Sequence, residues 1–266
     1  MNLRDFFASE KIEYFAVLPY NECRETRSNI MNRESFTPRS VIIYLLPYYT
    51  GRAENVSVYA TSLDYHIGIS EINARLIEYL KTHYPTNSYK GYGDHSPIDE
   101  RHAALIGGLG ILGDSGLLIN EKYGTYAFIA DLITDIDPSE LGSHTLYPLS
   151  FCEHCGACKR ACPTGVLRGE STECLSAITQ KKGTLTEYEI DLMQKYNTVW
   201  GCDLCQSSCP HNKSPKTTPI EFFHRERISA LTSATIDGMS DEEFSRRAFA
   251  WRGRAVVERN LKALKQ

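Results

Sequence analysis

The pattern of apolar and polar positions predicts a sheet in the N-terminal part of the chain. Residues 14–18 and 40–46 are short runs of β-branched and aromatic side chains bounded by polar residues or proline, as is typical of buried strands. We expect these two strands to lie in one sheet. Two more apolar runs, residues 117–119 and 126–130, flank the glycine-containing segment 120–124, which predicts a β-hairpin.

The sequence also predicts several helices. From Ile69 onward, apolar residues recur at three- and four-residue steps, which predicts a helix that ends near Pro85 and packs on the sheet. A second helix is expected to begin with Ser96 as its N-cap and Pro97 as its first residue, and to run to the glycines at 107 and 108. Two later helix starts carry capping boxes: Thr186 with Glu189, and Ser240 with Glu243.

Composition adds limits on size, charge and location. The chain has 266 residues and is 42% apolar, which is enough for one sizeable core and a smaller module. A formal net charge of −4 gives no overall electrostatic argument for a nucleic-acid partner. No apolar run approaches the roughly 18 residues of a membrane span, and the first 15 residues lack the order of a signal peptide. We therefore expect a cytoplasmic protein without a membrane partner.

The strongest chemical signal is a run of four cysteines. Cys152, Cys155, Cys158 and Cys162, followed by Pro163, reproduce the bacterial ferredoxin spacing C-x2-C-x2-C-x3-C-P. Two-residue gaps let three thiolates bind one four-iron cubane, while the fourth cysteine points to a different cluster. The run therefore predicts two [4Fe-4S] clusters in one chain.

A second run supplies most of the remaining ligands, and one isolated cysteine completes the set. Cys202, Cys205 and Cys209-Pro210 repeat the ending of the first run with one cysteine too few, and Cys174 is the only other cysteine in this half. We assign one cluster to Cys152, Cys155, Cys158 and Cys209, and the other to Cys162, Cys174, Cys202 and Cys205. Structural zinc is the competing interpretation, but interlocked runs of this kind do not follow the ligand pattern of a tetrahedral zinc site. Cys23, far upstream, is interpreted as a small buried side chain without a role.

These cysteine segments resemble one known family. Residues 151–165, 174–179 and 201–210, including the extra cysteine at 174, look like the epoxyqueuosine reductase family. The likeness covers most of the chain, and it extends through residues 93–101, 108–113, 117–120, 243–247 and 259–264.

The resemblance implies an α+β fold and an enzyme. It implies a sheet-and-helix domain for cobalamin and substrate at residues 1–145, a double-cluster ferredoxin-like domain at residues 146–220 and a helical segment at residues 221–266. Members of the family reduce cobalamin through the two clusters and remove the epoxide oxygen of epoxyqueuosine in tRNA. Single electrons from clusters can be gathered by a metal macrocycle for a two-electron reduction. An external low-potential electron donor is then required.

The resemblance also points to residues of the active site. Asp94 falls at the position of the family's catalytic aspartate, where a carboxyl group would protonate the opening epoxide and contact the cofactor. An ordinary acid at a helix start is the structural alternative. Ser176 and Thr179 match polar positions that line the cofactor, although such residues often only cap a helix. His66 is interpreted as a structural histidine rather than a cobalt ligand.

Departures from the family pattern leave the substrate open. Asp114 stands where the family usually has a lysine, and the sequence stops at Gln266, as expected of a short member without the C-terminal helical repeat used against tRNA. A tRNA partner is thus an expectation with less support than the clusters. The segment 246–266 is strongly basic and would suit either phosphates or a solvated helix face. An electron-transfer protein that serves or reactivates a partner corrinoid enzyme is the competing function.

Overall fold

A computed structural model describes residues 2–142 and 152–265, and the chain divides into two compact units. The first unit is Met1–Pro47 with His66–Glu153, and the second is Tyr48–Tyr65 with His154–Gln266. The segment Tyr48–Tyr65 therefore belongs to the second unit, although it lies between two parts of the first in the sequence. The predicted domain boundary at residues 145 and 146 falls outside the described residues.

A four-stranded antiparallel sheet forms the centre of the first unit, in the order β1-β2-β6-β3. Both strands expected from residues 14–18 and 40–46 are confirmed, and they pair with each other. Every residue of β2 is buried, as expected for a central strand covered on both faces. The strands of this sheet are β1 (Phe15–Pro19), β2 (Ser40–Pro47), β3 (Tyr89–Tyr92) and β6 (Ala127–Thr134).

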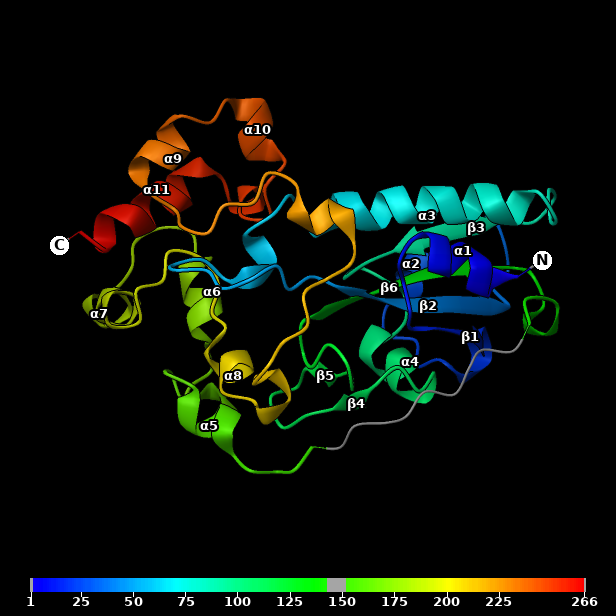
Figure 1. The fold of residues 1–266 in the computed structure, drawn as a ribbon, viewed down its shortest axis with the longest axis horizontal. Coiled ribbons are helices and arrows are strands. Elements are labelled where there is room, and N and C mark those ends of the chain that lie inside the picture. Colours follow the sequence, from blue (N-terminus) through cyan, green and yellow to red (C-terminus); the bar gives the residue numbers. More distant parts are fainter. Residues whose placement is uncertain (1, 143–151, 266) are drawn as a thin grey trace. The chain divides into compact units, whose positions relative to one another are not determined.

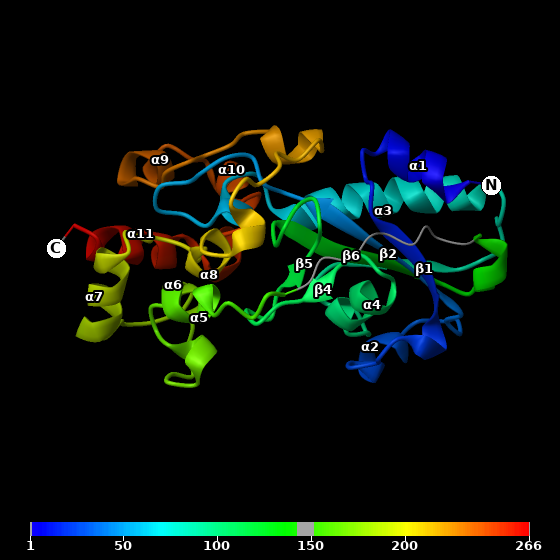
Figure 2. The same cartoon turned by 60° about the horizontal axis from the view of Figure 1, so that its bottom comes forward.

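Helices cover the two faces of this sheet (Figures 1 and 2). On one face lie α1 (Leu3–Ser9) and α3 (Tyr65–Lys81), where Tyr44 donates a hydrogen bond of 3.0 Å to Asn73 of α3. On the other face lies α4 (Glu100–Ile106), whose Ala103 belongs to the same apolar core as Ile43. Alternate residues of β2 thus serve opposite cores. The predicted helix from Ile69 is confirmed as the greater part of α3.

The expected hairpin is wrong in its pairing. The short strands β4 (Ile111–Leu112) and β5 (Leu118–Ile119) pair with each other, whereas β6 pairs with β2 and β3. Only the bridge between Asn120 and Gly124 closes the loop that the sequence suggested. The turn at residues 120–124 is therefore present, but the strand that follows it, β6, pairs with β2 and β3 and not with β5.

The start of α4 also differs from the prediction. Asp99, not Ser96, is the N-cap, because its carboxylate accepts the backbone N–H of His102 at 3.1 Å. Ser96 is fully buried and donates instead to the carboxylate of Asp131 in β6, with an Oγ–Oδ2 distance of 3.1 Å. The hydroxyl group of Ser96 therefore does not cap the helix, because it donates to the buried carboxylate of Asp131.

The second unit is helical and carries the cysteine runs. Both predicted capping boxes are confirmed, at the starts of α7 and α10. Its main core surrounds Trp200 and Phe249, and a smaller core joins α6 and α7. The helices of this unit are α5 (Ala157–Ala161), α6 (Leu175–Thr179), α7 (Glu187–Lys195), α8 (Leu204–Ser207), α9 (Ser233–Asp237), α10 (Asp241–Ser245) and α11 (Arg254–Ala263).

Several short elements complete the chain. The first unit contains the short helix α2 (Ser28–Met31) and the 3-10 turns η1 (Tyr20–Glu22) and η3 (Pro138–Glu140). The second unit contains the 3-10 turns η2 (Val58–Ala60), η4 (Val166–Arg168), η5 (Pro210–Asn212), η6 (Glu221–His224) and η7 (Ala250–Arg252). Within the described residues, no helix is both long and apolar enough to pass through a lipid bilayer.

The segment Tyr48–Tyr65 is fixed to the second unit beside two cysteines. Asp203, which stands between Cys202 and Cys205, accepts hydrogen bonds from the Ser57 hydroxyl group and from the backbone N–H of Val58, the latter at 2.7 Å. Val56 also forms a parallel bridge with Trp200. The cysteine loop and this segment therefore support each other.

Candidate functional site

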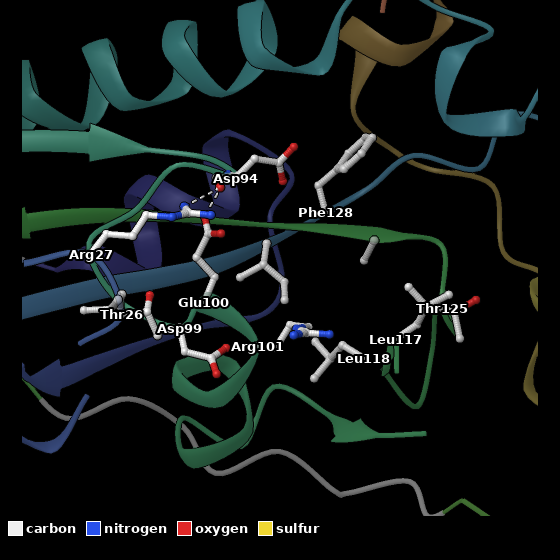
Figure 3. Close-up of a pocket in the computed structure, with 13 residues that line it drawn as sticks. Thr26, Arg27, Asp94, Asp99, Glu100, Arg101, Leu117, Leu118, Thr125 and Phe128 are labelled. Atoms are coloured by element: carbon white, nitrogen blue, oxygen red, sulfur yellow. Dashed lines mark hydrogen bonds between the residues drawn. The ribbon is translucent and has the colours of Figure 1, made fainter. Parts of the chain in front are cut away.

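Asp94 lies in the loop between β3 and α4, in a left-handed backbone conformation. Its φ is +65°, a region that residues other than glycine, asparagine and aspartate seldom adopt. Its backbone N–H donates to Glu100 Oε1 at 2.8 Å, and its carbonyl oxygen accepts from Arg27 Nη1 at 2.9 Å (Figure 3). Two side chains thus hold the strained turn, as is common where strain serves a site.

The carboxylate of Asp94 is accessible to a ligand. Its side chain is 53% exposed, and its Oδ2 lies 3.7 Å from Nε2 of His66, whose side chain is 48% exposed. An ion pair this exposed adds little stability. His66 is thus a neighbour of Asp94, and its interpretation as a structural histidine stays a prediction.

A cavity of about 490 Å³ opens beside Asp94. Its size is within the usual range for small-molecule sites, roughly 300–1,000 Å³. Charged and apolar side chains both line the cavity, with Arg27, Asp94 and Glu100 at one end and Leu117, Leu118 and Phe128 at the other, and Arg101 lies beside Leu118 (Figure 3). The cavity therefore suits a ligand that has both polar and apolar groups.

Two carboxyl groups, Glu100 at this cavity and the fully buried Asp131, have pKa values raised above their ordinary range. Burial, with the negative charges of Asp131 and Asp94, raises the pKa of Glu100 to about 8, although a backbone hydrogen bond and Arg27 act against this shift. Burial also raises the pKa of Asp131 to about 7, against the hydrogen bond from Ser96. Titratable groups displaced in this way are typical of functional sites.

Sequence reasoning missed Arg27, Glu100 and Asp131. Arg27 is distant in the sequence, and only the fold brings it to the loop of Asp94. Asp131 did give a signal, because it is the only charged residue in the otherwise apolar strand β6. A lone acid in a buried strand is costly and therefore points to a function or to a specific partner.

The cysteines of the second unit lie on two short helices and the loops around them. Cys158 is in α5 and Cys205 is in α8, and these two helices pack against each other. Cys174 is the residue that precedes α6. In the first cysteine loop, His154 and Gly156 both have left-handed backbone conformations, with φ of 50° and 70°, which produces the tight turn that a cubane requires.

Five of the thiols are close enough to act on one another electrostatically, and one of them, Cys158, is assigned to the other predicted cluster. Burial raises the pKa of Cys205 to about 12, and the charges of Cys174, Asp203, Cys162 and Cys158 contribute in the same direction. Burial likewise raises the pKa of Cys202 to about 12, with contributions from Cys174 and Cys205. The set Cys162, Cys174, Cys202 and Cys205 is thus brought together in one unit. Its assignment to one cluster stays a prediction.

The other predicted cluster is assigned to Cys152, Cys155, Cys158 and Cys209, and this assignment also stays a prediction. Cys155 is exposed, as the outer ligand of a cluster near the surface would be. In the first unit, Cys23 is buried and its thiol lies 3.7 Å from the carbonyl oxygen of Pro19, which fits the expected structural role.

Ser176 and Thr179 have different surroundings on α6. Thr179 is completely buried, and its hydroxyl group donates to the carbonyl oxygen of Ser176 at 2.8 Å and accepts the backbone N–H of Gly201 at 2.9 Å. It therefore joins α6 to the residue before Cys202. Ser176 is partly exposed, and its hydroxyl oxygen accepts from Gln180 at 3.0 Å.

The basic C-terminal segment uses its arginines internally. Arg254 donates to the carbonyl oxygens of Ile236 and Met239, and Arg259 donates to those of Lys181 and Gly183. These contacts favour a structural helix face over a phosphate-binding one.

Comparison with known proteins agrees with the cysteine spacing. Residues 151–212 match the family described as a 4Fe-4S double cluster binding domain. An epoxyqueuosine reductase of Escherichia coli K12 is 32% identical over 200 residues, which cover 71% of this chain and 50% of that protein. Another from Gloeobacter violaceus is 29% identical over 223 residues, covering 78% of this chain and 69% of that protein. The chain belongs to the epoxyqueuosine reductase family.

Solved structures of this family share the fold. The epoxyqueuosine reductase of Streptococcus thermophilus superposes with a TM-score of 0.79 at 21% identity, covering 98% of this chain and 79% of that one. A structure of the Bacillus subtilis enzyme, described as having an aspartate-bearing catalytic loop swung out of its active site, superposes with a TM-score of 0.77 at 20% identity, covering 98% of this chain and 80% of that one. The α+β fold is thereby confirmed. This chain spans about half the length of several curated relatives that it matches.

Proposed function

We propose that this chain is a reductase that removes the oxygen of an epoxide, with epoxyqueuosine in tRNA as its substrate. The observation that carries the proposal is the strained, accessible carboxylate of Asp94 at a cavity, in a chain that also contains a double-cluster domain. Converting an epoxide to an alkene takes two electrons and two protons and releases water. The clusters supply electrons, and Asp94 supplies a proton.

The cysteine residues fit the clusters by their chemistry. Thiolates are the usual ligands of four-iron clusters, and the described residues hold all eight predicted cysteine ligands. Burial raises the pKa of Cys162. Hydrogen bonds from the backbone N–H of Leu167 and from Thr164 outweigh this effect, so the pKa of Cys162 is lowered overall. Such bonds stabilise the thiolate and tune the reduction potential of a cluster.

Cobalamin is part of the proposal, and the three predicted contact residues fit it unequally. Asp94 and Ser176 present oxygen atoms that are at least partly exposed, which suits the amide groups at the edge of a corrinoid. The buried hydroxyl group of Thr179 is already engaged on both sides, so we assign it the positioning of α6. When bound, cobalamin gathers single electrons into a two-electron reductant.

The residues of the first unit prepare the protonation step. Arg27 and Glu100 fix the backbone on either side of Asp94, so its carboxyl group is held at the cavity without reorganisation. Leu117, Leu118 and Phe128 give the cavity apolar surface against which the carbon atoms of a substrate can pack. The proton passes from the Asp94 carboxyl group to the oxygen as the carbon–oxygen bond breaks.

Relatives motivate the choice of substrate. One structure is described as epoxyqueuosine reductase with an epoxyqueuosine-modified tRNA-Tyr stem loop. An external low-potential electron donor completes the proposed set of partners. Since Asp114 replaces the lysine expected from the family, we expect the dependence on tRNA to be weaker than in lysine-containing relatives.

The test is single-turnover reduction under anaerobic conditions. Protein reconstituted with iron, sulfide and cobalamin is mixed with a low-potential reductant and with epoxyqueuosine, either within a tRNA stem loop or as the free nucleoside. Formation of queuosine from either substrate supports the proposal. Binding of cobalamin without reduction of either substrate contradicts it and favours an electron-transfer protein that serves a corrinoid enzyme.

A further inference from the structure

Asp203 lies inside the second cysteine run, and its side chain is held by residues from elsewhere in the second unit. Its Oδ1 accepts hydrogen bonds from the Ser57 hydroxyl group and from Nε2 of Gln206, the latter at 3.1 Å. Its Oδ2 accepts the backbone N–H of Val58 at 2.7 Å. Three donors therefore converge on one side chain.

The pattern of these hydrogen bonds fits an ionised carboxylate. Both oxygen atoms of Asp203 accept hydrogen bonds, and an ionised carboxylate is a group that only accepts them. Burial raises the pKa of Asp203 above its ordinary value, and the three hydrogen bonds partly offset this shift. Hydrogen bonds to an ionised group are stronger than those between neutral groups, so the three donors compensate a charge that is partly removed from water.

The donors to Asp203 are themselves fixed by further hydrogen bonds. The backbone N–H of Ser57 donates to the carbonyl oxygen of Trp200 at 2.7 Å, and Oε1 of Gln206 accepts from the Tyr48 hydroxyl group at 3.2 Å. The segment that contains Tyr48 and Ser57 is therefore bonded to the chain on both sides of Cys202.

Gly201, the residue before Cys202, allows this close approach. Its φ is +75°, and a Cβ atom added to it would lie only 2.4 Å from Cβ of Ser57. The chain at Gly201 thus passes directly against Ser57, the same residue that donates to Asp203. The position of the Asp203 carboxylate is therefore fixed from several directions.

A charge at this position acts on the cluster to which Cys202 and Cys205 are assigned. Asp203 directly follows Cys202 and precedes Cys205 by two residues, and its charge contributes to raising the pKa of both thiols. A nearby carboxylate makes the addition of an electron to a cluster less favourable, whereas hydrogen bonds donated to that carboxylate weaken its effect. The charge of Asp203 and its three donors thus act in opposite directions on the reduction potential.

We propose that Asp203 lowers the reduction potential of the cluster assigned to Cys202 and Cys205, and that Ser57 limits this effect. The inference goes beyond the proposed function, because it rests on the double-cluster domain and not on the substrate. Asp203 is a positioning residue that acts through its charge and through the placement of the two thiols, without a bond to iron. Lowering the potential makes the reduced cluster a stronger electron donor.

The test is a redox titration that needs no substrate. Protein reconstituted anaerobically with iron and sulfide is poised at a series of potentials, and electron paramagnetic resonance follows the reduced clusters. Asp203→Asn keeps the shape of the side chain and removes the charge, so one of the two reduction steps should move to a more positive potential. The ratio of reduced to oxidised cluster at a fixed potential should rise roughly tenfold, which is a shift of about 59 mV for one electron. Two unmoved steps overturn the proposal.

Ser57→Ala is the complementary variant. It removes one donor and keeps the carboxylate, so the same step should move in the opposite direction, to a more negative potential. Asp237→Asn is the matched control, because Asp237 is an exposed acid at the end of α9 in the same unit, and it should leave both steps in place. Shifts of Asp203→Asn and Ser57→Ala in the same direction indicate a change in packing and overturn the proposal.

Ser57→Ala also keeps the test decisive if Asp203→Asn does not bind its full complement of iron. A Ser57→Ala protein that holds about eight irons per chain and has one step at a more negative potential supports the proposal. Loss of iron or an unmoved step in this variant, which retains the charge, overturns it. None of these measurements involves epoxide reduction, so their outcome is independent of whether the proposed function is correct.

Discussion

The two units of this chain differ in how much of their candidate chemistry can be predicted from local sequence. For the clusters, the ligand assignment is a prediction made from cysteine spacing, because neighbouring thiols in tight loops are brought together by local structure. In the first unit, the surroundings of Asp94 depend on Arg27 from before α2 and on Asp131 from β6. Cysteine spacing alone is therefore enough to propose metal ligands, while the surroundings of Asp94 are defined only once the sheet is assembled.

The units also differ in what holds them together. The first has a sheet whose central residues Val41, Ile42 and Ile43 are 0% exposed. The cysteine loops of the second have few buried apolar side chains, so we expect them to depend on their metal. The predictions below test this contrast, beginning with the largest effect.

Removing iron should disorder the cysteine loops and spare the first unit. The binding energy of a metal site is also folding energy, because its ligands do not converge in the unfolded chain. Chelated protein should therefore be cleaved by protease within residues 152–212, while the sheet of the first unit stays resistant. Limited proteolysis with mass spectrometry checks this, and equal resistance throughout would remove the contrast between the units.

Replacing one cysteine should separate the two clusters. Cys174→Ala should lose or degrade the cluster that also uses Cys162, so iron should fall from about eight to about four atoms per chain. Cys23→Ala is the matched control, because that thiol is buried in the first unit and should leave the iron content unchanged. A full iron complement in Cys174→Ala would show that the assignment is wrong.

Asp94→Asn should separate catalysis from folding. It keeps the shape of the side chain but removes the transferable proton, so single-turnover reduction should fall by roughly 10² to 10⁴. Asp5→Asn, in the first turn of α1, is the control for an ordinary helix-start acid and should cost less than about 1 kcal/mol of stability with no change in rate. Undiminished turnover in Asp94→Asn would leave Asp94 with a structural role only.

Asp131 should make the first unit less stable as pH rises. Its folded-state pKa of about 7 lies above its ordinary value of 3.8, so the folded chain retains a proton that the unfolded chain releases. The stabilisation is complete below about pH 4, and about 4 kcal/mol of it is lost as pH rises to about 7. Asp131→Asn should reduce this dependence in urea unfolding followed by circular dichroism, and the part that comes from the raised pKa of Glu100 should remain. Parallel pH curves for the two proteins would contradict the assignment.

Local sequence patterns predict most of the helices and strands, but fewer of the pairings between strands. The apolar run at residues 40–46 and the spacing from Ile69 identified β2 and α3, because burial and period are encoded locally. The run at residues 126–130 was paired with its neighbour in sequence, whereas β6 pairs with β2 and β3, which come from elsewhere in the chain. Pairing over such distances is decided by the assembled core.

The N-cap of α4 and the residues around Asp94 also could not be predicted fully from local sequence. Ser96 has the composition of an N-cap, but the buried Asp131 bonds its hydroxyl group and Asp99 caps α4 instead. Asp94 was identified through family resemblance, while Glu100 was overlooked because its importance comes from the charge of Asp131 across the fold. A residue whose properties depend on a neighbour from a distant part of the sequence can be recognised only when the structure shows that neighbour.

The left-handed backbone of Asp94 has an evolutionary consequence. Glycine is the residue that adopts this conformation without cost, and every aspartate codon is one base change from a glycine codon. A single mutation at this position thus relaxes the loop and deletes its carboxyl group together. A stability screen of this chain therefore needs an activity filter, because a glycine here would keep the backbone conformation available and lose the carboxyl group unnoticed.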